Sequence, residues 1–154
     1  MGISTKSTYG IRAMFELALH YGNSPISVTC ISNKENISVP YLEQLLSKLR
    51  RKGLVKSVRG PTGGYILAKD PKDITVGDIV MALDGEITPS HCAVGKAANK
   101  NCKMIDRCVT KTVWQKLKGA VDGVLDGVTL KDLANDARKL GIDKVVEHKY
   151  MFNI

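Results

Sequence analysis

The sequence contains no apolar stretch that approaches the ~20 residues needed to cross a bilayer. Its N-terminal region also lacks the basic segment, continuous apolar run and small-residue cleavage site of a signal peptide. These absences predict a cytoplasmic protein with no membrane partner. Because thiols stay reduced in that compartment, clustered cysteines are expected to bind metal or undergo redox chemistry rather than form structural disulfides.

Motifs of catalysis are missing as well. The chain has no C-x-x-C pair, no Gly-rich nucleotide fingerprint and no recognisable set of nucleophile and base. It also has no internal repeat and no long linker. We therefore expect no enzymatic activity and no small-molecule substrate.

Acidic residues are in the minority, with 15 Asp and Glu against 23 Lys and Arg, which gives a formal net charge of +8. This balance favours an anionic partner, with nucleic acid ahead of a membrane surface. A basic soluble protein without such a partner is the alternative. The hydrophobic content of 44% is ordinary for a folded domain, and a length of 154 residues suffices for one domain with a core.

Apolar periodicity and turn residues predict a mainly α fold with a small β-hairpin. Helices are expected over residues 5–21, 28–36, 40–52, 75–84, 107–127 and 129–140, with the hairpin over 54–69. Thr75 and Thr129 are candidate caps. Three helices followed by a hairpin is the order of a winged helix-turn-helix domain, in which the third helix enters the major groove of DNA.

Basic residues gather around the end of the third helix and the hairpin, where no acidic residue interrupts them between positions 48 and 59. They are Lys48, Arg50, Arg51, Lys52, Lys56 and Arg59. Cations in this arrangement would bind DNA phosphates and make affinity dependent on salt. The alternative is a solvated basic helix end followed by an unrelated hairpin.

Residues able to read bases lie at the start of the same helix and at the hairpin tip. Glu43 can accept a hydrogen bond from cytosine N4, and Gln44 can pair with adenine. Arg59 could enter a narrow minor groove. The remaining candidates are Ser38, Tyr41, Gly60 and Thr62. For Glu43, the alternative is a surface carboxylate that pairs with a nearby lysine or arginine side chain on its own helix.

Three cysteines lie in a loop-like segment with the spacing C-x9-C-x5-C, at Cys92, Cys102 and Cys108. Thiolates at this spacing suit an iron–sulfur cluster, zinc or a thiol–disulfide switch, and the spacing alone does not separate them. The neighbouring cations would lower the thiol pKa values; they are Lys96, Lys100, Lys103 and Arg107. Cys30, outside the loop, is expected to be a small core residue.

The stretch "YLEQLLSKLRRKGLVKSVRGPTGGY", within a likeness that runs from about residue 1 to 135, closely resembles the IscR-type family of bacterial winged-helix transcription regulators, in its cluster-binding branch. This resemblance implies a homodimer on a double-stranded DNA operator. It implies that Tyr41, Glu43, Gln44 and Arg59 read the DNA. It also implies an iron–sulfur cluster on the three loop cysteines, with [2Fe–2S] expected ahead of [4Fe–4S], that senses cluster status, redox state or nitric oxide.

The resemblance divides the chain into four parts. Residues 1–85 would form the winged helix-turn-helix domain, 86–108 the cluster-binding loop, 109–140 the dimerisation helices and 141–154 a C-terminal tail. An apolar stripe supports dimerisation by the long helix; its members are Trp114, Leu117, Val121 and Leu125.

The chain departs from the family pattern at several positions. The interval between the first two cysteines is longer than usual, and Lys111 stands where the family can carry a histidine ligand. Thr8 stands where a partner subunit can supply a carboxylate, and Pro40 where a serine would not be unusual. The fourth cluster ligand is therefore open, with His91 and then Asp106 as local candidates. A cluster-free repressor controlled by a protein partner is a further alternative.

Overall fold

The computed structural model describes residues 2–94, 102–104 and 106–143. Its helices are α1 (Thr5–Leu19), α2 (Val28–Glu35), α3 (Val39–Arg51), α4 (Val76–Leu83), α5 (Lys111–Gly127) and α6 (Leu130–Lys139), with short 3₁₀ turns η1 (Pro71–Asp73) and η2 (His91–Val94). The strands are β1 (Val55–Val58) and β2 (Gly64–Leu67). No helix in these ranges is long and apolar enough to span a membrane.

Helices α1, α2 and α3 form the helix-turn-helix unit around one apolar core. Met14 and Leu42 are both completely buried in it. The turn into α3 uses Asn36 in the left-handed conformation (φ 53°), which ends α2. Pro40 then lies in the first turn of α3, where its missing N–H disrupts no helical hydrogen bond. The predicted winged-helix fold is confirmed.

The wing is an antiparallel hairpin with Val55 opposite Leu67. A two-stranded hairpin alone is marginally stable in water. Here Ile26 adds a β-bridge to Tyr65, with both backbone hydrogen bonds made at 3.1 and 2.8 Å. A Cβ atom at Gly64 would lie 2.1 Å from the carbonyl oxygen of Ile26, so this close approach requires glycine. The hairpin is thereby held against the helix-turn-helix unit.

Helices α4 and α6 begin side by side. Thr75 and Thr129 cap their helices as predicted, and in the structure each forms a capping box, with Asp78 and Asp132 as the respective partners. The two threonines also form a β-bridge with one another. The start of α6 therefore returns to the start of α4, whose Ile79 and Leu83 belong to the main core.

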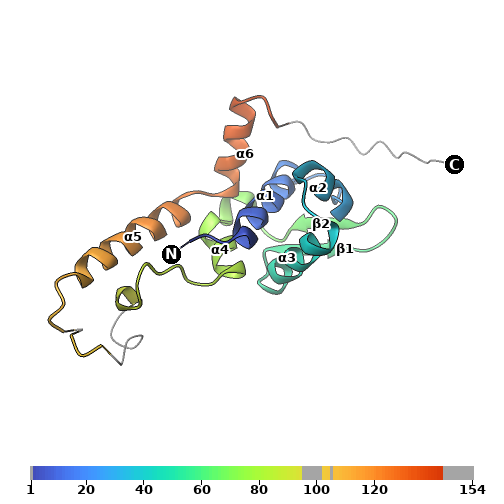
Figure 1. The fold of residues 1–154 in the computed structure, drawn as a ribbon. Helices are drawn as coiled ribbons and strands as arrows, with labels where there is room; N and C mark the ends of the chain where they lie inside the picture. Colours follow the sequence, from blue (N-terminus) through green and yellow to red (C-terminus); the bar gives the residue numbers. More distant parts are fainter. Residues whose placement is uncertain (1, 95–101, 105, 144–154) are drawn as a thin grey trace.

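Helix α5 extends away from the helix-turn-helix unit, on the side opposite the wing (Figure 1). It begins at Lys111 rather than near residue 107 as predicted, because residues 106–110 form turns and the chain first becomes helical after Thr110. None of its side chains is buried in the protomer. By contrast, α6 packs against α1, and its Leu130 belongs to the main core.

Candidate nucleic-acid interface and cysteine loop

The outward side of α3 forms an open groove. Its lining residues are Pro40, Glu43, Gln44, Ser47, Lys48 and Arg51. The opposite side of the helix is buried through Leu42, Leu45, Leu46 and Leu49. Amphipathic spacing thus turns the polar side of α3 to solvent. Four of the predicted DNA-binding residues come together here, and Ser47 joins them although no motif in the sequence marked it.

Ser38 is the N-cap residue of α3, yet its side chain makes no capping hydrogen bond. An N-cap hydroxyl normally accepts from the N–H of the second or third helical residue. Pro40, the second residue of α3, has no N–H to donate, and the N–H of Tyr41, the third, makes no hydrogen bond to the Ser38 side chain either. The Ser38 side chain is exposed beside the groove, where it can bind another group.

Tyr41 is half-buried and packs toward α1. Its ring meets that of Tyr9 edge-on, with ring centroids 6.1 Å apart, and Arg12 stacks over Tyr9 at 5.5 Å. The guanidinium of Arg12 also forms an ion pair with Glu35 at 2.6 Å. These contacts join the start of α3 to α1 and to the end of α2. Tyr9 and Arg12 lie three residues apart on one helix, but no motif marked either of them in the sequence.

The hairpin tip carries the predicted wing residues. Arg59, Gly60 and Thr62 are all exposed, and Gly60 adopts a φ of 115° that favours glycine. Within β1, one residue before the strand ends, the Ser57 hydroxyl accepts a hydrogen bond from Arg50 at 3.1 Å, which links the end of α3 to the hairpin. This hydrogen bond helps to fix the position of the hairpin relative to α3.

Most of the predicted phosphate-binding cations are exposed, and Lys48 is partly so. Within the described part of the chain, no ion pair joins an acidic side chain to Lys48, Arg51, Lys52, Lys56 or Arg59. Glu43 likewise forms no ion pair among those residues. Both the positive charge and the Glu43 carboxylate are thus available to an external partner.

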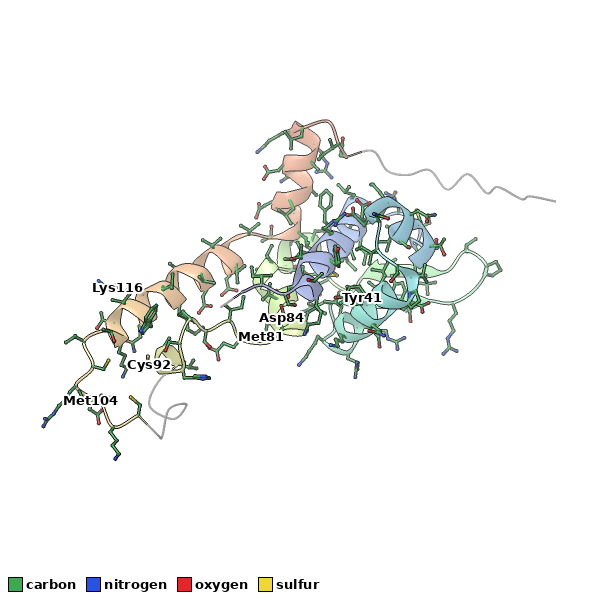
Figure 2. All side chains as sticks on the ribbon, in the orientation of Figure 1. Tyr41, Met81, Asp84, Cys92, Met104 and Lys116 are labelled. Atoms are coloured by element: carbon green, nitrogen blue, oxygen red, sulfur yellow. The ribbon has the colours of Figure 1, made fainter. Side chains whose placement is uncertain are left out.

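The three loop cysteines are free and partly exposed. Cys92 lies in η2, with its Sγ 3.1 Å from the Ser90 hydroxyl. Cys108 lies just before α5, with its Sγ 3.0 Å from the Thr110 hydroxyl. Cys102 lies in the short described segment between them. Figure 2 shows Cys92 near the outer end of α5, well separated from Tyr41 on α3.

Cys108 is prepared to ionise. The Thr110 hydroxyl and the backbone N–H groups of Lys111 and Thr110 hydrogen-bond its sulfur and lower the pKa of the thiol. The main cause differs from the expectation, since hydrogen bonds lower the pKa of Cys108 more than charge does; the contributing cation is Lys111 rather than the predicted Lys103 and Arg107. The other two predicted cations, Lys96 and Lys100, lie outside the described residues.

A cluster needs soft thiolate ligands in one connected segment. Residues 91–108 supply three free thiols, one of them with a lowered pKa, so the donor chemistry fits. Among the described residues, no three His, Cys, Asp or Glu side chains are arranged to hold a metal ion. His91 and Asp106, the candidate fourth ligands, are both exposed.

Asp84 closes α4 immediately before this segment. Its carboxylate accepts hydrogen bonds from the Ser4 N–H (3.0 Å), the Ser4 hydroxyl (2.5 Å) and the Ser7 hydroxyl (2.7 Å). Lys6 forms an ion pair with it at 3.2 Å. In Figure 2, Asp84 lies between Tyr41 and Cys92. The carboxylate joins the start of α1 to the point where the cysteine segment begins, a link that nothing in the sequence signalled.

A family model described as "Rrf2: Iron-dependent Transcriptional regulator" matches residues 3–136. IscR of Serratia proteamaculans is 42% identical over 136 residues, covering 88% of this chain and 80% of that protein. IscR of Photorhabdus laumondii is 37% identical over 142 residues, covering 92% and 84% respectively. Both are HTH-type transcriptional regulators.

Solved structures similar to this one belong to the same kind of regulator. The T. potens IscR structure is 44% identical with a TM-score of 0.73, covering 91% of this chain and 90% of that one. CymR of B. subtilis, a global cysteine regulator, is 42% identical with a TM-score of 0.74, covering 88% and 98%. These relatives are regulators rather than enzymes. The chain described here belongs to the Rrf2 family and is an IscR-type, DNA-binding transcriptional regulator.

Proposed function

We propose that this regulator acts in the cytoplasm as a homodimer on a double-stranded DNA operator, and that an iron–sulfur cluster controls its binding. The observation that carries this proposal is the set of three free thiols at Cys92, Cys102 and Cys108, in the segment that joins the DNA-binding fold to α5. Thiolates attract soft metals, and a ligated segment is more ordered than a free one.

DNA would be read by the groove side of α3. Glu43 would accept a hydrogen bond from cytosine N4, and Gln44 would pair with adenine in the major groove. Lys48, Arg50 and Arg51 would bind phosphates. At the wing, Arg59 would enter the minor groove, with Gly60 and Thr62 near the backbone. The supporting observation is that these side chains are accessible while the apolar side of α3 is buried.

Dimerisation would use α5. Val113, Trp114, Leu117 and Val124 are between 36% and 66% exposed on this helix. An apolar helix face of this kind is stabilised when another apolar surface covers it. A second copy of α5 offers a matching surface under twofold symmetry. The resulting dimer would place two recognition helices on a pseudo-palindromic operator.

The cluster would be held by Cys92, Cys102 and Cys108, with His91 proposed as the fourth ligand and Asp106 as the other local candidate. When bound, a cluster of the expected [2Fe–2S] type supplies a cross-link that oxidant, nitric oxide or iron shortage removes. The protein side of this chemistry is thiol ionisation, which the Thr110 hydroxyl and two backbone N–H groups favour at Cys108.

Control of DNA binding would follow from ordering residues 91–108 against the DNA-binding domain of the partner. Such a change shifts binding only if the two arrangements differ in their affinity for DNA. Asp84 connects the segment to the start of α1 and so to the helix-turn-helix unit.

Anaerobic purification with iron, sulfide and visible-absorption measurements tests the proposal. We expect a coloured protein, and iron loss in Cys92→Ser, Cys102→Ser and Cys108→Ser. Cys30→Ser, outside the loop, is the matched control and should retain both colour and iron. A colourless protein with stoichiometric zinc would contradict the cluster and indicate a zinc site instead. A colourless protein with oxidant-dependent disulfides would indicate a thiol–disulfide switch. Full colour in all three loop variants would overturn the cysteine assignment.

A further inference from the structure

Pro40 is an apolar residue in an otherwise polar groove. It is exposed and lines the α3 groove together with Glu43 and Gln44. Residues three and four positions apart occupy the same side of a helix, so these three side chains present one continuous surface. Pro40 lies at the N-terminal end of that surface, the end that approaches base edges in helix-turn-helix complexes.

The chemistry of Pro40 restricts what it can recognise. Its ring has no hydrogen-bond donor or acceptor, and its backbone nitrogen carries no hydrogen. In the major groove, the apolar feature of a base edge is the C5-methyl group of thymine. The ring is also rigid, so contact with it costs little conformational entropy.

We propose that Pro40 packs against a thymine methyl group and makes thymine the preferred base at one position in each operator half-site. This inference rests on the proposed placement of α3 in the major groove. Burying one methyl group is worth about a fourfold change in affinity. Next to this contact, the uncapped hydroxyl of Ser38 remains free for a polar contact with the DNA.

Replacing thymine with deoxyuridine tests the proposal, because this exchange removes only the methyl group. We expect one thymine per half-site of the selected operator at which deoxyuridine lowers the affinity of the unmodified protein about fourfold. In Pro40→Ser the loss at that position should disappear, while losses at other thymines remain. Pro40→Ser should stay folded and lose no more than the small stabilisation that a proline contributes at a compatible position, because a serine can occupy the first turn of a helix.

The outcomes separate this inference from the function on which it rests. If Glu43→Ala and Gln44→Ala change the preferred operator sequence but no deoxyuridine exchange weakens binding, the role of Pro40 is wrong and the placement of α3 stands. An equal deoxyuridine effect in Pro40→Ser and the unmodified protein also overturns the role. If Glu43→Ala and Gln44→Ala leave the preferred sequence unchanged, the placement of α3 and the Pro40 contact both fall.

Discussion

Asp84 is only 13% exposed, and four groups surround its carboxylate. Burial alone would raise the pKa of this carboxyl, but the hydrogen bonds from Ser4 and Ser7 outweigh burial and lower the pKa to about 2, from an ordinary value of 3.8. A carboxyl with a lowered pKa stabilises the folded state while it is ionised. Its contribution is complete above about pH 4 and is lost as the pH falls toward 2.

Asp84→Asn should therefore lower the free energy of unfolding at pH 7 by about 2 kcal/mol, since the charged acceptor is lost. Between pH 4 and pH 2, the difference in the free energy of unfolding between variant and parent should shrink. What remains is the effect of replacing a neutral carboxyl with an amide. Urea denaturation at a series of pH values measures both effects. Asp73→Asn, at an exposed carboxyl in η1, is the matched control and should change neither. A constant difference at all pH values would contradict the role of the ionised carboxylate.

Arg59 at the wing tip is exposed. If it enters the minor groove, Arg59→Ala should cost ~1–3 kcal/mol of operator binding free energy. The slope of log affinity against log salt should fall by about one for each phosphate that the variant no longer binds. Fluorescence anisotropy at several salt concentrations measures both quantities.

Lys131→Ala removes an exposed positive charge from α6 and serves as the control for net charge. It should leave the operator affinity close to that of the parent. Equal affinities and slopes for Arg59→Ala and the parent would remove the wing from the proposed interface.

At the scale of elements, local signals predicted the fold well. The helical spacing of the apolar residues in α3 and the capping threonines before α4 and α6 depend on neighbouring residues, and the structure confirms both. Helix α5 begins later than periodicity predicts, because the Cys108 sulfur and the Thr110 hydroxyl hydrogen-bond each other in a turn that periodicity does not show. The role of Asp84 depends on contacts about 80 positions away in sequence, so local patterns could not reveal it.

Residue type, spacing and family resemblance predict the DNA-contacting and cysteine residues, and the roles of these residues stay predictions. What the structure adds is accessibility. On α5, for example, Leu125 of the predicted stripe lines a groove against α4, while Val113 and Val124 are more exposed than Trp114. Sequence periodicity identified the helix, but which side of it packs on its own protomer depends on tertiary contacts.

Leu117→Asp should convert the proposed dimer to monomers, because a charge in a buried apolar interface is unfavourable. Operator binding should weaken greatly, since two half-sites would no longer be bound together. Sedimentation equilibrium at micromolar concentration measures the association. Gln115→Asp adds the same charge at an exposed position on about the opposite side of α5 and should remain dimeric. A dimer that persists in Leu117→Asp would place the interface elsewhere.

At the scale of the whole molecule, cluster binding and DNA binding should be linked reciprocally. If the iron-loaded protein binds its operator more tightly than the apo-protein by some factor, the operator must raise the affinity for the metal centre by the same factor. We therefore expect operator DNA to raise the fraction of iron that the protein retains at equilibrium with a chelator, or to lower that fraction if the apo-protein binds the operator more tightly. DNA of scrambled sequence is the control. An operator that changes iron retention no more than scrambled DNA, despite a difference in operator affinity, would contradict the linkage.

The β-bridge between Thr75 and Thr129 closes a long stretch of chain in which α4 packs in the core and the cysteine segment and α5 follow it. The entropy of a closed loop depends only logarithmically on its length, so even a doubling costs about 0.6 kcal/mol. Inserting or deleting a few residues between Cys92 and Cys102 therefore costs the DNA-binding fold very little free energy. Over evolutionary time the thiol spacing can drift while the helix-turn-helix unit keeps its shape, and a nine-residue interval is one length that such a closed stretch readily accommodates.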